Sequence, residues 1–194
     1  MSIPFVVEAR PDTGLHNARL GMWLFLASEA MLFGGLFSAY ALLRAGAPEW
    51  PHGQLGVPLG LFNTAVLLVS SFSMKRACAA ARSQDRGGHR MWLGITLALA
   101  IVFLAVKGVE YREHIAAGQV PATSTFFAIY YTLTGVHALH LVGGIAVMMY
   151  LLGPGSRLWV TRQGQFANRV EATGLYWYFV DVVWVIAFVL LYLS

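Results

Sequence analysis

Residues 125–152 read TFFAIYYTLTGVHALHLVGGIAVMMYLL, a run of 28 residues without a single Asp, Glu, Lys or Arg. A helix needs roughly 20 mostly apolar residues to cross the hydrocarbon core of a bilayer. In hydrocarbon, backbone N–H and C=O groups find partners only within a helix or a closed barrel, and barrel strands alternate in segments of ~10 residues. The unbroken run therefore predicts a membrane-spanning α-helix.

Runs of this kind recur along the 194-residue chain, separated by short connections that contain Gly, Pro, Ser or Asp and are typical of loops. The predicted spans are approximately residues 19–43, 57–80, 91–111, 125–152 and 170–193. We therefore expect an all-α membrane protein that forms a five-transmembrane-helix bundle. Residues 1–18 are expected to be an N-terminal tail, and residues 19–194 the transmembrane domain.

The composition excludes several other classes of protein. The chain is 58% hydrophobic and 11% charged, with a mean hydropathy of +0.63, whereas a soluble domain has about 25% charged residues. A single cysteine, Cys78, excludes an internal disulfide framework and an all-cysteine metal site. The net charge of +4 would suit nucleic acid, but the basic residues lie between the apolar runs rather than in one patch, so we expect no nucleic-acid partner.

Positive charge is distributed unevenly between the two sides of the predicted bundle. Of the 13 Lys and Arg residues, three lie on the side of the first and third loops, namely Arg44, Lys107 and Arg112. The other ten lie on the side of the tail and the second and fourth loops: Arg10, Arg19, Lys75, Arg76, Arg82, Arg86, Arg90, Arg157, Arg162 and Arg169. Because basic residues favour the cytoplasmic side, we expect the N-terminus inside and, after an odd number of spans, the C-terminus outside. The same excess attracts anionic lipid headgroups.

The first 18 residues do not resemble a cleaved signal peptide. They carry Glu8, Arg10, Pro11 and Asp12 and lack a continuous apolar core. We therefore expect a cytoplasmic or surface-lying tail.

A few ionisable groups are expected at membrane depth. Glu29 lies ~15 Å along the first helix at 1.5 Å per residue, and Asp181 has a similar place in the fifth. A charge at this depth costs about 2.5–3.5 kcal/mol, so such groups normally face other protein. For both acids, a structural interhelical hydrogen bond and a chemical role remain open. Glu110 is expected near the outer end of the third helix, paired with Lys107 or Arg112 or exposed to water.

Two histidines lie near the middle of the fourth predicted helix. His137 and His140 are three residues apart, so both rings can point to roughly the same side, and haem or metal ligation has to be considered. No second pair of histidines occupies another predicted span. The favoured interpretation is therefore that both make hydrogen bonds in helix packing.

Small and aromatic residues indicate where helices meet. Small residues allow helices to approach closely, and they occur in three predicted spans, as Gly34 with Ser38, Ser70 with Ser73, and Gly143 with Gly144. The aromatic run 176–178 with Trp184 lies inside a span as well as at its rim, which favours a packed subunit interface over an interfacial belt. The chain has no nucleophile elbow, phosphate loop or broken-helix repeat. These residues alone thus predict a membrane protein with a few buried acids and no active site of its own.

Four blocks of sequence carry a resemblance to a known family. Residues 20–33 (LGMWLFLASEAMLF) closely resemble the helix of cytochrome c oxidase subunit III that carries the family's buried glutamate. Residues 61–68 (LFNTAVLL) resemble its next helix. Residues 124–127 (STFF) and 135–140 (GVHALH) are similar to its penultimate helix, and residues 176–184 (YWYFVDVVW) resemble its closing signature. The blocks occur in the family's order and span nearly the whole chain.

The resemblance implies the last five helices of the family's seven-helix form. It implies a cofactor-free accessory subunit of an aa3-type cytochrome c oxidase, an oxidoreductase that also moves protons, with no catalytic centre in this chain. The expected partners are subunit I, which holds haem and copper and reduces oxygen, subunit II and other oxidase subunits, and bound phospholipid. The resemblance also implies that the chain supports proton uptake, stable turnover and oxygen access of the oxidase. A bacterial plasma membrane is the implied location, and membership of a respiratory supercomplex is left open.

The resemblance also assigns residues. Glu29 matches the family's buried acid, with a candidate role in the oxygen route or in proton chemistry. The intramembrane polar and packing residues are Asn63, Glu110, His137, His140, Tyr178 and Asp181. Many family members have His where this chain has Tyr178, and a tyrosine hydroxyl donates a hydrogen bond but does not titrate near neutrality. No residue of this chain is expected to be catalytic or to bind a cofactor or metal.

Three alternatives stay open on the sequence. The chain could be the equivalent subunit of a quinol oxidase or of a nitric oxide reductase, because other subunits set the substrate. It could be a self-contained proton or solute transporter with Glu29 and Asp181 as relays. It could also be a free-standing b-haem enzyme with His137 and His140 as ligands.

Overall fold

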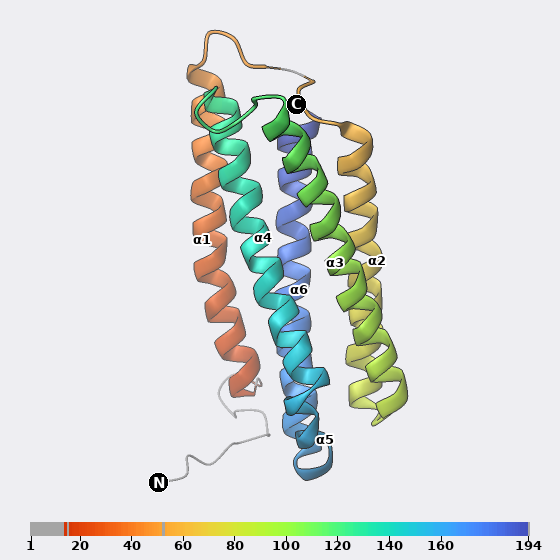
Figure 1. The fold of residues 1–194 in the computed structure, drawn as a ribbon. Coiled ribbons are helices and arrows are strands. Elements are labelled where there is room, and N and C mark those ends of the chain that lie inside the picture. Colours follow the sequence, from red (N-terminus) through yellow and green to blue (C-terminus); the bar gives the residue numbers. More distant parts are fainter. Residues whose placement is uncertain (1–13, 15, 52, 194) are drawn as a thin grey trace.

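The computed structural model describes residues 14, 16–51 and 53–193 of the chain, and the long helices are the predicted ones (Figure 1). Five helices are long and apolar enough to cross a membrane. They are α1 (Asn17–Gly46), α2 (Val57–Arg82), α3 (Arg86–Ala116), α4 (Thr125–Leu152) and α6 (Gln163–Tyr192). A 3-10 turn, Pro154–Arg157, and the short helix α5 (Leu158–Thr161) connect α4 to α6. The predicted five-helix, all-α architecture is therefore confirmed.

The helix ends differ from the predicted spans, because helical hydrogen bonding continues beyond the apolar stretch. α6 starts at Gln163, seven residues before the predicted span, and α3 starts at Arg86, five residues before its span. α1 starts at Asn17, within the predicted tail, most of which lies outside the described residues. The cytoplasmic placement of the tail and the orientation of the bundle remain predictions.

Local sequence explains where several helices begin and turn. The Asp85 carboxylate accepts a hydrogen bond from the Gly88 N–H at 2.9 Å, and the Ser124 hydroxyl accepts one from the Phe127 N–H at 3.2 Å. Each side chain thereby caps the first turn of a helix, α3 or α4. Between α2 and α3, Gln84 has φ = 60°, which reverses the chain within three residues. α2 and α3 consequently form a tight antiparallel pair.

Two tryptophans of α6 fill the centre of the bundle. Trp177 and Trp184 are fully buried, and their indole N–H groups donate to the hydroxyls of Ser70 and Thr64 on α2, both at 3.0 Å. A Cβ atom at Gly144 of α4 would lie 2.7 Å from the Trp177 ring, so only glycine allows this approach. The small residues at 70 and 144 therefore do bring helices together. The predicted subunit interface is wrong for the two tryptophans, which pack inside this chain.

α1 is the least buried of the long helices. It packs against α6 and α4, with α6 lying between α1 and the α2–α3 pair (Figure 1). Its buried side chains, Leu26, Phe33 and Tyr40, are spaced seven residues apart on one face. Gly34 and Ser38 are exposed, and nothing lies within 4 Å of a Cβ built on Gly34. The predicted close approach at these two residues is thus not made within the described part of the chain.

Candidate functional site

Glu29 of α1 is joined to His140 of α4. The carboxylate Oε2 lies 2.8 Å from the imidazole Nε2, and both side chains are about one-sixth exposed, at 16% and 17%. The other ring nitrogen, Nδ1, lies 2.8 Å from the carbonyl oxygen of Val136. A carbonyl only accepts hydrogen bonds, so Nδ1 carries a proton. Glu29 and His140 consequently share one further proton across the Oε2–Nε2 contact.

Aromatic side chains enclose this pair from α1 and α6. Phe33 and His140 pack edge-to-face with ring centroids 5.0 Å apart, and the Tyr176 hydroxyl donates to the His140 carbonyl at 2.8 Å. Beside the pair, a groove of about 250 Å³ between α1, α4 and α6 is lined by Phe25, Gly143 and Tyr176 among other residues. Neither Glu29 nor His140 lines this groove, but Phe25 lies one helical turn before Glu29 and Gly143 one turn after His140.

A second charged pair, Lys107 with Glu110, lies inside the bundle. The Lys107 Nζ is 3.2 Å from Glu110 Oε1, and the two residues are 4% and 3% exposed. The hydroxyls of Tyr130 on α4 and Tyr192 on α6 donate to the same Oε1 at 2.7 and 2.5 Å. The ammonium also contacts the two hydroxyl oxygens, at 3.2 and 2.6 Å. One carboxylate oxygen thus ties together side chains from three helices.

Four aromatic rings surround the Lys107 ammonium. Its Nζ lies 4.9–5.5 Å from the ring centroids of Tyr111, Tyr130, Trp184 and Tyr192, within the range of cation–π attraction. The expected pairing of Glu110 with Lys107 is present. The alternative that Glu110 is exposed to water is wrong, because partners from α4 and α6 enclose it. Lys107, counted with the basic residues on the side of the first and third loops, is likewise enclosed within the bundle.

Asp181 connects α6 to α2. Its carboxylate Oδ2 accepts a hydrogen bond from the Ser71 hydroxyl at 2.5 Å, and the residue is 4% exposed. Tyr178, one turn earlier, is only half-buried and lines a groove between α1, α2 and α6. The two residues of the closing signature therefore have different surroundings.

His137 and Asn63 are buried without hydrogen bonds among the described residues. The exposed fraction is 1% for His137 and 0% for Asn63, and neither the imidazole nitrogens nor the amide atoms have a partner there. The His137 ring packs against Phe103 of α3 and Trp184 of α6, with centroids 5.6 and 5.2 Å away. His140 instead contacts Glu29 of α1, so the two rings point to different sides. The predicted hydrogen bond in helix packing is present for His140 and wrong for His137 among the described residues. No group of three or more His, Cys, Asp or Glu side chains in the described ranges could hold a metal ion.

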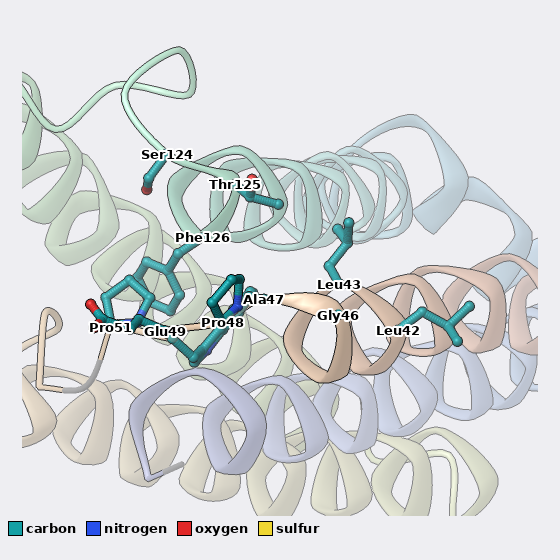
Figure 2. A pocket seen from close by; sticks show the side chains of 11 residues that line it. Leu42, Leu43, Gly46, Ala47, Pro48, Glu49, Pro51, Ser124, Thr125 and Phe126 are labelled. Atoms are coloured by element: carbon teal, nitrogen blue, oxygen red, sulfur yellow. The ribbon is translucent and has the colours of Figure 1, made fainter.

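A larger hollow lies at the other end of α1. Figure 2 shows this cavity, of about 610 Å³, between Pro48 and Pro51 of the α1–α2 loop and Phe126 at the start of α4. Glu49 is the one charged residue among the described residues of its lining, and none of the predicted site residues reaches it. The cavity therefore does not join either charged pair.

Sequence reasoning missed the tyrosines that complete the Lys107 pair. The spacing of Lys107 and Glu110, three residues apart on one helix, could have revealed their contact within an apolar run. Tyr130 and Tyr192 lie 20 and 82 residues from Glu110 along the chain, and no local pattern connects them. The His140 partner of Glu29 was a candidate, but its pairing was not predicted.

Comparisons with known proteins cover almost the whole chain. The family described as cytochrome c oxidase subunit III matches residues 12–194. Cytochrome c oxidase subunit 3 of Synechocystis sp. is 40% identical over 96% of this chain and 80% of its own length. Cytochrome bo(3) ubiquinol oxidase subunit 3 of Pseudomonas aeruginosa is 33% identical over 94% and 87%. A heme-copper oxidase subunit I+III of Aeropyrum pernix is 35% identical over 90% of this chain and 22% of its own length.

Proposed function

The chain belongs to the cytochrome c oxidase subunit III family, and we propose that it is the cofactor-free accessory subunit of an aa3-type oxidase in aerobic respiration. The observation that carries this proposal is the family match over residues 12–194, which includes every long helix. An accessory role fits an interior whose charged groups are tied to neighbouring helices rather than directed at a substrate.

The proposed direct partner is the haem-copper catalytic subunit I. Support comes from the Aeropyrum pernix relative, whose name joins subunits I and III in one chain. The exposed face of α1, which includes Gly34 and Ser38, offers a surface on which a neighbouring helix can pack closely. Haem and copper would lie in partner subunits, with subunit II completing the oxidase in a bacterial plasma membrane.

The proposed contribution of Glu29 is to hold a proton beside a path for oxygen or lipid. The pair with His140 carries one shared proton, and the neighbouring groove is lined largely by apolar side chains. Dioxygen is apolar and enters such a groove without losing hydrogen bonds. A bound phospholipid would keep the groove apolar and exclude water from it.

Purification of the native complex tests the proposal. The chain should co-purify with a haem-copper catalytic subunit, identified by mass spectrometry, and the complex should show the optical bands of haem a. A stable complex that contains this chain but no haem-copper subunit would refute the proposal.

A quinol oxidase is the second candidate, because the Pseudomonas aeruginosa relative is named as a ubiquinol oxidase subunit. Turnover of the purified complex with reduced cytochrome c or with quinol distinguishes the two. The transporter alternative has little support, since Glu29 bonds to α4 and Asp181 to α2 and they form no relay. The b-haem alternative loses its basis because His137 and His140 face different helices.

A further inference from the structure

Two buried tyrosines, Tyr130 and Tyr192, place their hydroxyls on the same carboxylate oxygen. Both donate to Glu110 Oε1, at 2.7 and 2.5 Å. At such distances a positioned carboxylate accepts a proton directly from a reacting group. A phenol that is hydrogen-bonded to a carboxylate loses an electron more readily than a phenol alone, because its proton moves to the carboxylate as the electron leaves. Each of the two tyrosines therefore has a proton acceptor in place.

The Lys107 ammonium contacts the same two hydroxyls from the other side. Its Nζ lies 3.2 Å from the Tyr130 oxygen and 2.6 Å from the Tyr192 oxygen. An ammonium only donates hydrogen bonds, so it holds a phenoxyl oxygen in position after the proton has left for Glu110. The proton can then return to the same oxygen when the electron is replaced.

Further aromatic rings lead away from the two tyrosines in two directions. The Trp184 ring, fully buried in the centre of the bundle, lies 6.2 Å from the Tyr192 ring between centroids. On the other side, the Tyr131 ring lies 5.1 Å from the Tyr130 ring. Both distances are those of packed aromatic pairs. Tyr131 is only half-buried, and its hydroxyl donates to the carbonyl of Gln119 in the α3–α4 loop at 3.0 Å. Oxidisable side chains thus extend from the bundle centre to this loop.

We propose that Tyr130 and Tyr192 form a redox-active pair that gives one electron to a radical oxidant derived from partly reduced oxygen. The electron leaves through Trp184 and reduces the oxidant, while one tyrosine O–H bond breaks and its proton passes to Glu110 Oε1. A neutral tyrosyl radical and a protonated carboxyl group are formed. A water-soluble one-electron reductant at the α3–α4 loop then returns an electron through Tyr131, and the proton returns from Glu110 to the tyrosine oxygen.

The inference rests on the proposed function only for the source of the oxidant, a neighbouring subunit that reduces oxygen. The tyrosines, the proton acceptor and the connecting rings all belong to this chain. The pair gives this subunit a chemical activity of its own, the removal of oxidising radicals from the bundle. An ionisable pair enclosed at membrane depth is a functional candidate for the same reason that it is rare.

Photo-oxidation of the purified full chain in detergent tests the tyrosine pair. A ruthenium tris-bipyridine complex, oxidised by a flash and a quencher, supplies the one-electron oxidant, and electron paramagnetic resonance of rapidly frozen samples records tyrosyl radicals. Tyr130→Phe combined with Tyr192→Phe keeps both rings and should lower the lasting radical signal severalfold. The matched control is Tyr111→Phe, because the Tyr111 hydroxyl pairs with Thr134 rather than with a carboxylate, and it should keep the wild-type signal. An unchanged signal in the double variant, or an equal loss in the control, overturns the proposal.

The proton transfer to Glu110 is tested separately. In the wild-type chain, equilibration in deuterated water should slow radical formation severalfold, because an O–D bond breaks in the same step. Lys107→Met with Glu110→Gln, which removes both charges together, should slow radical formation about 10²-fold, the contribution of a positioned proton acceptor. Equal rates in the two solvents, or equal rates in this variant and the wild type, refute the transfer.

A last pair of variants tests the path to the loop. Tyr131→Phe should lower the radical yield with the water-soluble oxidant, whereas Tyr150→Phe, which removes a more exposed tyrosine outside the cluster, should not. The same yield in both variants overturns the path through Tyr131. None of these measurements uses another subunit, so their failure refutes the tyrosine pair alone. Failure of the chain to co-purify with a haem-copper subunit refutes the proposed function and not the pair.

Discussion

Two acidic residues, each paired with a basic side chain, occupy different environments in this molecule. Glu29 and His140 meet between the peripheral helix α1 and α4, each about one-sixth exposed and joined by one contact. Lys107 and Glu110 are buried, with exposed fractions of 4% and 3%. They are hydrogen-bonded to Tyr130 and Tyr192, and four aromatic rings surround the ammonium. Acidic residues within membrane-spanning helices therefore differ in burial and in the number of partners that hold them. The enclosed pair connects three helices, whereas the peripheral pair joins two helices through a single side-chain contact.

The largest expected effect on stability comes from removing one partner of the enclosed pair, Lys107 with Glu110. Lys107→Met removes the cation and leaves the Glu110 carboxylate buried without it, which should destabilise the full chain by about 3–5 kcal/mol. The loss is measured by thermal unfolding of the purified chain in detergent, followed by helical circular dichroism. The double variant Lys107→Met with Glu110→Gln removes both charges and should recover part of the loss. If the single variant is as stable as the wild type, the pair does not hold the helices together.

An intermediate effect is expected where α4 meets α6 in the enclosed region. Gly144→Ala places a Cβ 2.7 Å from the Trp177 ring and should cost about 1–3 kcal/mol through overpacking. Gly143→Ala is the matched control, because its Cβ would lie 3.6 Å from the Tyr176 hydroxyl, an ordinary contact. The control should stay within about 0.5 kcal/mol of the wild type in the same unfolding measurement. Equal losses in the two variants would contradict the close contact with Trp177.

The smallest effect on stability is expected at the peripheral pair. Glu29→Gln keeps a side chain that hydrogen-bonds to His140, and such bonds average only ~0.6 kcal/mol in membrane proteins. Assembly should therefore remain intact, while oxidase turnover at low oxygen, or its persistence over many turnovers, should change. Lys107→Met is the informative comparison, because it should lower the free energy of unfolding more than it changes the oxygen dependence of turnover. Wild-type rates for Glu29→Gln under both conditions would show that the pair has no part in the oxidase reaction.

The sequence predicts the long helices because membrane insertion depends on local apolar runs. The run at residues 125–152 coincides with α4 at both ends. The start of α6 at Gln163 could not be predicted in this way, because its first two turns are largely polar and precede the apolar run. The four-residue helix α5 has no periodicity to detect.

Individual site residues could be identified, but most of their partners could not. Glu29 and Asp181 are visible as charges within apolar runs. Their partners lie 111 and 110 residues away along the chain, and only the folded arrangement of the helices brings them together. For the same reason, the burial of Glu110 depends on tyrosines from two other helices and could not be inferred from its position near a helix end.

The peripheral packing of α1 has a consequence for how the protein is made. Among the described helices α1 is synthesised before the others, yet the helix it packs against most, α6, is synthesised after α2, α3 and α4. During translation α1 therefore remains in lipid without its main neighbour, which its exposed apolar residues tolerate. We therefore expect α1 to complete its packing only after α6 is made, through the Tyr40 hydroxyl bonded to the carbonyl of Leu190 and through Phe33 beside Phe179.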